Sequence, residues 1–228
     1  MRSYIAAAFP FFLILVSARL VMTPLFLSFE YTRSGFPSDP YGFSMQDRLD
    51  YAPYALQYLL NDTDIDFLGN LRFTDGKEMY NVRELQHMRD VKEVTQFAFT
   101  FALIIGFMAI VSVLALRQLA PRLLWQALFS GSMLTLALIA SVVLIAITSW
   151  DTFFTTFHGL FFAGGTWQFA YSDTLIRLFP EQFWFDAALT IGAFSVSTAL
   201  IVLWVSVQRM NKKHSILTPL STNDKLPQ

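Results

Sequence analysis

Residues 150–186 read WDTFFTTFHGLFFAGGTWQFAYSDTLIRLFPEQFWFD, and the rest of the chain is best understood outward from this stretch. It places His158, Trp167 and a pair of glycines among many phenylalanines and several carboxylates. The stretch is too polar for an ordinary membrane span and too aromatic for an ordinary loop, and aromatic residues gather where a membrane meets water. We therefore expect residues 150–182 to line a site at the membrane surface.

Four apolar runs accompany this segment, and each can cross the ~30 Å hydrocarbon layer, which takes about 20 residues. The chain of 228 residues is 54% hydrophobic and 14% charged, whereas about a quarter of the residues of a soluble domain are charged. The sequence predicts a membrane all-α protein, a four-transmembrane-helix bundle with a small extracytoplasmic α+β domain. The expected segments are membrane helices at residues 1–29, 94–116, 123–149 and 183–207, the extracytoplasmic domain at 30–93, the outer-face segment at 150–182 and a cytoplasmic tail at 208–228.

Charge and composition set an orientation and restrict the function. Basic residues such as Arg2, Arg117 and Arg209 flank the apolar runs on one side, and the positive-inside rule makes that side, with both termini, cytoplasmic. The site then faces outward. A formal net charge of −1 indicates no nucleic-acid partner, and the lack of cysteine excludes thiolate nucleophiles and cysteine-based metal sites.

Helix and turn signals occur throughout residues 30–93. Ser44 and Asp47 have the spacing of a capping box, which predicts a helix that continues to Leu60. A Gly-Asn pair predicts a β-hairpin over residues 67–73, and the Asp-Gly pair that follows predicts a further turn. The hairpin is the reason for expecting an α+β domain here.

His87 lies near the start of a long predicted helix. Asn81 and Glu84 give the start signal, and nothing interrupts the helix over residues 82–116. Glu84 and Asp90 lie three residues before and after His87, so both share its helical face. A nearby carboxylate fixes the tautomer of an imidazole and supports its positive charge, as a general base requires. The plainer interpretation is a solvated or packed histidine.

The segment around His158 is predicted to begin with an interfacial helix over residues 151–163. Its phenylalanines are typical of an aromatic belt, and the two glycines that follow permit a sharp turn. Asp173 is expected to cap the next helix, and Glu181 to lie in the first turn of the last membrane helix. Both carboxylates are therefore interpreted as structural.

Arg19 lies inside the first apolar run, in the outer half of the bilayer. A charge within the membrane costs ~2.5 to 3.5 kcal/mol on insertion scales and usually faces a partner or a cavity. Two alternatives stay open. Arg19 forms an ion pair with a carboxylate such as Asp151 or Asp186, or it donates to a substrate carbonyl or a lipid headgroup.

The common motifs for phosphate binding, serine hydrolysis and zinc peptidases are lacking. Glu84 and His87 have the spacing of a helical carboxylate–histidine metal pair, but a single copy is a weak signal. We predict no metal and no cofactor. A metal-dependent membrane hydrolase using Glu84, His87, Asp90 and His158 stays an alternative, as does a non-enzymatic tetraspan scaffold.

Two separated motifs resemble a known family. They are ELQHMRDVK at residues 84–92 and FHGLFF at 157–162, the latter followed by Trp167 and by DTLIRLFPEQF at 173–183. In combination they closely resemble the lipoprotein intramolecular transacylase family, tetraspan membrane enzymes found mainly in Gram-positive bacteria. The resemblance extends from the first span to the fourth, and it implies a location in the bacterial cytoplasmic membrane.

The resemblance implies an O-to-N acyl shift, in which the sn-2 acyl chain of an S-diacylglyceryl group moves to the α-amino group of the lipoprotein's own N-terminal cysteine. The product is a lyso-form lipoprotein. The implied partners are diacylglyceryl-modified lipoprotein N-termini and membrane lipid. The family's two essential histidines correspond by motif to His87 and His158.

Attack of an amine on an ester needs a base, an acid for the departing oxygen and donors for the oxyanion. We assign His87 as the base and His158 as the acid or oxyanion donor, and the exchanged roles stay open. Five further side chains are predicted to support them: Glu84 or Asp90 by tuning His87, Trp167 by lining an acyl-chain groove, and Arg19 or Lys92 by contacting the carbonyl or the glyceryl region.

Overall fold

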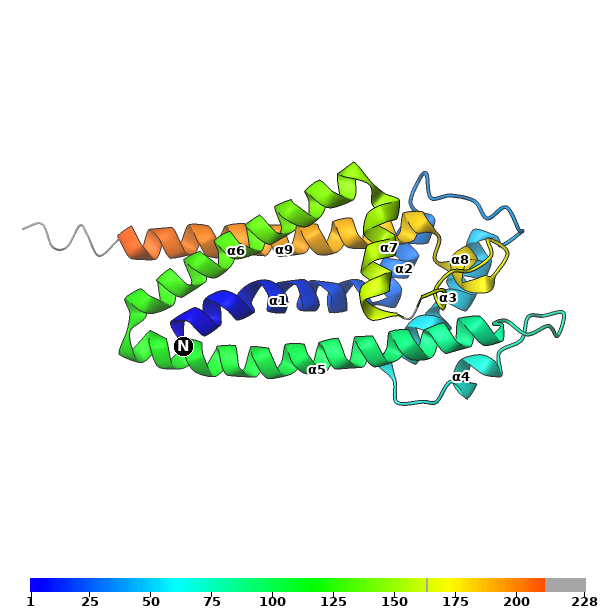
Figure 1. Ribbon diagram of the computed structural model, residues 1–228, viewed down its shortest axis with the longest axis horizontal. Helices are drawn as coiled ribbons and strands as arrows, with labels where there is room; N and C mark the ends of the chain where they lie inside the picture. The colour runs from blue at the N-terminus through cyan, green and yellow to red at the C-terminus, as the bar shows by residue number, and fades with distance from the viewer. Residues whose placement is uncertain (163, 212–228) are drawn as a thin grey trace, which may run out of the picture.

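The computed structural model describes residues 1–162 and 164–211, which form a helical protein (Figure 1). Within these two ranges no residue lies in a β-strand, and one isolated bridge joins Arg72 to Glu78. The helices are α1 (Arg2–Val21), α2 (Pro24–Thr32), α3 (Met45–Leu60), α4 (Asp66–Gly69), α5 (Val82–Leu119), α6 (Pro121–Thr148), α7 (Trp150–Phe161), α8 (Thr174–Leu178) and α9 (Glu181–Asn211).

Helices α1, α5, α6 and α9 are each long and apolar enough to cross a membrane, which confirms the four predicted spans. They lie lengthwise beside one another in Figure 1, and their main contacts join α1 to α5, α6 and α9, and α6 to α9. Most residues of these spans are not buried inside the protein, as is possible where lipid tails solvate apolar side chains about as well as a protein core does. The protein is therefore an integral membrane protein.

The two ends of the bundle differ in what they carry. The N-terminus and the last turn of α9 lie together at one end (Figure 1), where α5 and α9 finish with the basic residues Arg117 and Arg209. The short helices α2, α3, α4, α7 and α8 gather at the other end, with α7 lying across the bundle. Helix α9 continues to Asn211, past the expected boundary, and the rest of the predicted tail lies outside the described residues.

The first span is divided between α1 and α2, instead of forming the single helix expected over residues 1–29. Thr23 has an extended backbone (φ −140°, ψ 151°), because a residue before proline avoids the helical region and Pro24 lacks the N–H of a continuing helix. The side-chain oxygen of Thr23 accepts a hydrogen bond of 3.3 Å from the N–H of Phe26 and so caps α2. The break lets α2 pack against α3.

The expected hairpin over residues 67–73 is wrong, and with it the α+β description of the outer domain. A single-turn helix, α4, forms there with Leu68 fully buried. Asn70 has a right-handed backbone (φ −87°, ψ −6°), whereas a tight two-residue hairpin needs positive φ at its turn. Positive φ occurs instead at Gly76 (φ 85°), in the predicted Asp-Gly turn, where its N–H donates to the carbonyl of Phe73 at 2.9 Å.

Helix α3 begins and ends where the sequence predicted. Ser44 accepts a hydrogen bond of 3.1 Å from the N–H of Asp47, and the Asp47 carboxylate accepts one of 2.7 Å from the N–H of Ser44. This reciprocal cap satisfies two N–H groups that the first turn of a helix leaves unpaired.

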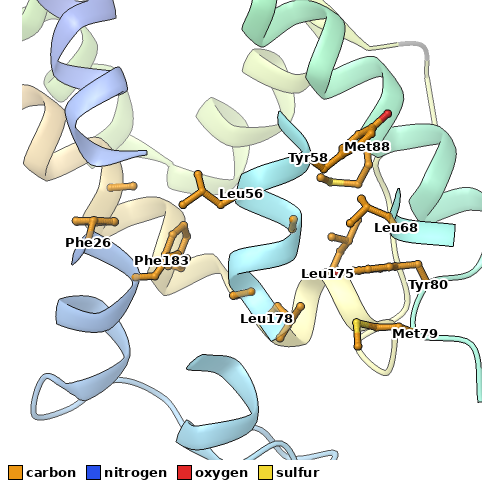
Figure 2. Packing of buried hydrophobic residues seen from close by; sticks show 14 of the residues in the cluster. Phe26, Leu56, Tyr58, Leu68, Met79, Tyr80, Met88, Leu175, Leu178 and Phe183 are labelled. Atoms are coloured by element: carbon orange, nitrogen blue, oxygen red, sulfur yellow. The ribbon is translucent and has the colours of Figure 1, made fainter. Parts of the chain in front are cut away.

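A hydrophobic core joins the outer helices to the bundle. In Figure 2, Phe26 of α2 and Phe183 of α9 lie on one side of α3, and Tyr58, Leu68 and Met88 lie on the other. Each fully buried apolar side chain of this size contributes ~1.5 to 3 kcal/mol. The core therefore fixes the first turns of α5 relative to the start of α9.

Arginines add polar ties between the same elements. Arg177 of α8 donates to the Asp39 carboxylate at 2.9 and 3.0 Å. Arg33, which follows α2, pairs with Glu30 at 2.8 Å and also with Asp186 of α9. These ion pairs thus anchor α8 and the first turns of α9 to the outer domain.

Candidate active site

His87 lies one turn after the start of α5, on its buried face. Its side chain is 9% exposed. The ring centroid lies 5.0 Å from that of Phe162 and 5.3 Å from that of Phe169, both in edge-on contacts. The Nδ1 atom is buried and has no hydrogen-bond partner among the described residues. His87 is therefore a packed imidazole that keeps unused hydrogen-bonding capacity.

His158 lies on α7, whose start is capped by the Ser149 hydroxyl accepting from the N–H of Thr152 at 3.2 Å. Its Nδ1 atom lies 2.8 Å from the carbonyl oxygen of Phe154. A carbonyl only accepts hydrogen bonds, so Nδ1 carries the proton and Nε2 of the neutral ring keeps a lone pair. The nearest rings are Phe154 at 4.0 Å, Trp167 at 4.8 Å, and Phe157 and Phe162 at 5.8 Å.

Phe162 is the residue that brings the two histidines into one site. Its ring centroid lies 5.0 Å from that of His87 and 5.8 Å from that of His158. The two imidazole centroids are therefore separated by at most the sum of these distances. Two histidines far apart in the sequence thus lie in one aromatic cluster at the end of the bundle opposite the basic helix ends.

Both imidazoles are held in the neutral form. Burial lowers the pKa of His87 from 6.5 to about 4. The repulsion that would arise if His158 were protonated as well lowers it further, and the negative charge of Asp90 opposes the shift. Burial also lowers the pKa of His158, against the hydrogen bond to the Phe154 carbonyl, which raises it. Near pH 7 each ring can therefore offer one donor and one acceptor.

Glu84 does not tune His87 in the way that the sequence suggested. One of its oxygens accepts from the N–H of Asn81 at 2.8 Å, and the other accepts from the N–H of Leu175 at 2.7 Å. The pKa of Glu84 is raised by burial. Asp173, expected to cap α8, makes no side-chain cap and accepts instead from the N–H of Ala170 at 2.9 Å. The hydrogen bond that caps the start of α8 is instead accepted by Glu84, from a distant part of the chain.

Asp90 and Lys92 differ in their relation to the site. The charge of Asp90 acts on His87, while its carboxylate accepts a hydrogen bond of 2.9 Å from Gln86. The Lys92 amine is buried and donates to the Thr63 carbonyl at 2.5 Å and to Asn61 at 3.3 Å. These contacts give Lys92 a structural role, and its contact with substrate stays a prediction.

Arg19 has none of the carboxylate partners considered from the sequence. Its guanidinium donates to the Met22 carbonyl at 3.1 Å and lies 6.0 Å from the Phe99 ring centroid. The carboxylate of Asp186 is paired with Arg33 instead. The expectation of an Arg19–Asp186 ion pair is therefore wrong, and no carboxylate of the described residues forms a salt bridge with Arg19.

Several residues that position the imidazoles were not among those predicted from the sequence. Phe169, which packs on His87, carries no polar group that would mark it. The carbonyl of Phe154 could have been found, because residues four apart in a helix are neighbours on one face. Phe162 was visible within the motif at residues 157–162, yet its contact with both imidazoles depends on how the following loop folds back.

The metal-site alternative is not supported by the arrangement of its four candidate ligands. Both Glu84 oxygens are bonded to backbone N–H groups. Among residues 1–162 and 164–211, no three His, Asp or Glu side chains form a group with metal-binding geometry. The described part of the site thus brings together two imidazoles in aromatic surroundings.

The fold and site define a class of protein: a four-span helical membrane protein with two neutral histidines at one end of its bundle. The family model described as lipoprotein intramolecular transacylase Lit matches residues 3–184. The chain therefore belongs to the lipoprotein intramolecular transacylase family, as its motifs indicated.

Individual relatives agree with this membership. An uncharacterized protein of Aquifex aeolicus is 32% identical over 199 residues, which cover 87% of this chain and 89% of that protein. The solved structure of the membrane-integral lipoprotein intramolecular transacylase Lit from Bacillus cereus matches with a TM-score of 0.72 at 18% identity, covering 94% of this chain and 96% of that chain. A variant of it with a histidine replaced by alanine matches with a TM-score of 0.55. At 18% identity, this similarity shows that the two proteins share a fold.

Proposed function

We propose that the protein catalyses intramolecular O-to-N acyl transfer on bacterial lipoproteins. The sn-2 acyl carbon of S-diacylglyceryl-cysteine forms a bond to the α-amino nitrogen and loses its bond to the glycerol oxygen. One proton moves from the nitrogen to that oxygen, and the product is the lyso-form lipoprotein. The observation that carries the proposal is the contact of two neutral imidazoles with the same ring, that of Phe162, in a member of a transacylase family.

The hydrogen bonds favour His158 as the base. Its Nδ1–H donates to the Phe154 carbonyl, which leaves Nε2 as the lone pair that takes the amine proton. His87 suits the opposite role. A proton on its buried, unpartnered Nδ1 would be an unsatisfied donor, so the proton belongs on Nε2. That Nε2–H then donates to the oxyanion and to the departing glycerol oxygen. The proposed roles are therefore the reverse of those assigned from the sequence, where His87 was the base and His158 the acid or oxyanion donor.

Positioning supplies the rest of the rate enhancement. The amine and the ester belong to one bound molecule, and a well-oriented intramolecular reaction lowers the barrier by ~7 to 11 kcal/mol at its limit. Trp167 and the phenylalanines around His158 give the acyl chain an apolar surface. Arg19 lies in the last turn of α1 and has no carboxylate partner among the described residues. It is proposed to contact the ester or glyceryl region of the substrate.

The proposed location is the outer face of the bacterial cytoplasmic membrane, with both termini cytoplasmic. Supporting this, basic residues end α5 and α9 at the end of the bundle opposite the site. Mature lipoproteins present their amine and esters at the outer leaflet. Because the chain has no cysteine, single cysteines at Arg2 and at Tyr171 can be labelled with an impermeant thiol reagent in intact cells. Only the cysteine at position 171 should react.

The activity is tested in bacterial cells that lack other N-acylating enzymes. Expression of the protein should convert diacyl lipoproteins into the lyso-form, as measured by mass spectrometry of N-terminal lipopeptides. His87→Ala and His158→Ala should leave the diacyl form. Full lyso-form production by both variants, or none by the parent protein, would overturn the proposal.

A further inference from the structure

Glu84 is the most deeply buried carboxylate near the site, and it touches neither imidazole. Its side chain is 1% exposed. It lies three residues before His87, so it shares the helical face of that residue. A carboxylate this dry persists as an anion only where hydrogen bonds replace its water. The two hydrogen bonds that do so connect segments that are 91 residues apart in the chain.

The first of these bonds closes the cap of α5. Asn81 accepts from the N–H groups of Arg83 and Glu84 at 2.9 and 3.0 Å, and Glu84 accepts from the N–H of Asn81 at 2.8 Å. The reciprocal pair fixes the first turn of the helix. It therefore also fixes the direction in which His87, one turn later, leaves the helix.

The second bond holds the other half of the site. The N–H of Leu175, in the first turn of α8, donates to Glu84 at 2.7 Å. Helix α8 has no cap from its own N-cap residue, so this distant carboxylate satisfies one of its first N–H groups. The loop just before α8 carries Trp167, which packs on His158, and Phe169, which packs on His87.

We propose that Glu84 is a positioning residue of the acyl transfer: one carboxylate joins the start of α5 to the start of α8 and so sets His87 against the loop that supports His158. The inference rests on the proposed function. Glu84 acts by fixing the distance between these two segments. Both of its carboxylate oxygens accept hydrogen bonds from backbone N–H groups, so neither binds an imidazole. A second, weaker tie runs in parallel, since Arg83 donates to the Gln168 carbonyl at 3.3 Å.

Glu84→Gln tests the two hydrogen bonds of Glu84 without changing the packing of the side chain. Glutamine keeps the size of the side chain but offers one carbonyl oxygen where two acceptors are needed, and its NH2 group faces an N–H donor. We expect kcat per folded molecule to fall about 10- to 100-fold, with a much smaller change in KM. Glu93→Gln is the matched control, because Glu93 is an exposed glutamate on the same helix, and it should retain the parent kcat.

A cross-link then distinguishes positioning from a charge effect. Cysteines replace Arg83 and Gln168, which are already in contact, and a bifunctional thiol reagent of about the length of an arginine side chain joins them. The chain contains no other cysteine to react. In the Glu84→Gln background, linking the pair should restore most of the kcat of the linked parent pair. A linked Glu84→Gln protein that stays slow, or an unlinked one that is as fast as the parent, overturns the inference.

The failure of this inference is distinct from failure of the proposed function. If the parent protein makes no lyso-form lipoprotein, the proposed function fails before any variant is compared. If the parent is active and Glu84→Gln matches it per folded molecule, only the positioning role is lost. The folded fraction is measured by size-exclusion chromatography in detergent, so a variant that merely folds poorly lowers the yield and leaves kcat unchanged.

Discussion

The two histidines lie on supports of opposite kind. His87 projects from the start of α5, where Glu84, Met88 and Lys92 are all buried with it and a double cap fixes the first turn. His158 projects from α7, a helix without a single buried residue among those described. Its ring is held by the bond to the Phe154 carbonyl and by neighbouring aromatic rings.

This difference in support suggests that the two histidines have different catalytic roles. A donor for an oxyanion works best when it is fixed before the reaction, because a preorganised dipole needs no rearrangement as charge develops. A base has to reach the amine of a flexible lipid-linked peptide, and α7 lies across the bundle with an exposed apolar face that includes Phe157, Leu160 and Phe161. The rigid support therefore suits His87 as donor, and the adaptable one suits His158 as base.

The largest expected effect comes from removing the base. His158→Gln should lower kcat by about 10²- to 10⁴-fold, because an amide cannot take the amine proton. The thermal midpoint in detergent should change little, since α7 buries almost nothing. The measurement is single-turnover conversion of a synthetic diacyl lipopeptide followed by mass spectrometry. A loss no greater than that of His87→Gln would reverse the assigned roles.

The donor side should give a graded response. His87→Ala removes the proposed Nε2–H and should cost about 10²- to 10³-fold in kcat, as removal of an oxyanion donor does elsewhere. His87→Gln keeps an N–H donor and should retain clearly more activity than the alanine variant. Equal activity of the two variants would show that donation from this position is not what His87 supplies.

The aromatic support of His158 should have a smaller effect. Trp167→Leu removes the ring that lies 4.8 Å from the imidazole and should lower kcat by about 10-fold, since a loosely held base spends less time in the reactive geometry. Trp184→Leu is the matched control. Trp184 lies at the same end of the protein, but its ring contacts are with Phe179 and Phe183. Matching losses in both variants would point to general damage of the fold.

Most of the fold could be predicted from the sequence, because its signals are local. Apolar run lengths gave the four spans, and the Ser44–Asp47 and Asn81–Glu84 spacings gave two helix starts that the structure confirms. The errors arose where a local signal competes with packing. A Gly-Asn pair resembles a hairpin turn, but burial of Leu68 favours a helical turn there, and residues 71–73 pair with residues 77–79 across the next turn instead.

The site could be predicted only in part. The motifs singled out His87 and His158, but nothing local states that Phe162 contacts both rings. Glu84 was predicted to support His87, but the second partner of its carboxylate, the N–H of Leu175, is a backbone group that a sequence does not display. Contacts between distant segments depend on loop paths, and side-chain patterns do not encode those.

The smallest expected effect is on stability. It tests whether the ring of His87 is as well shielded from water as its contacts indicate. The folded pKa of His87, about 4, lies below the unfolded value of 6.5, so the unfolded chain binds the proton first as the pH falls. The free energy of unfolding should therefore drop as the pH falls from 6.5 toward 4. Between pH 7.5 and 6 this amounts to about 0.8 kcal/mol.

His87→Gln lacks a titrating ring, so its thermal midpoint in detergent should fall less than that of the parent protein over this interval. The part that remains includes the contribution of His158, whose pKa is also lowered by burial. Equal pH dependence of the two proteins would mean that water reaches the His87 ring. In that case the rigid, dehydrated donor and the adaptable base would no longer differ in the way that their surroundings imply, because burial is the largest cause of the lowered pKa of His87.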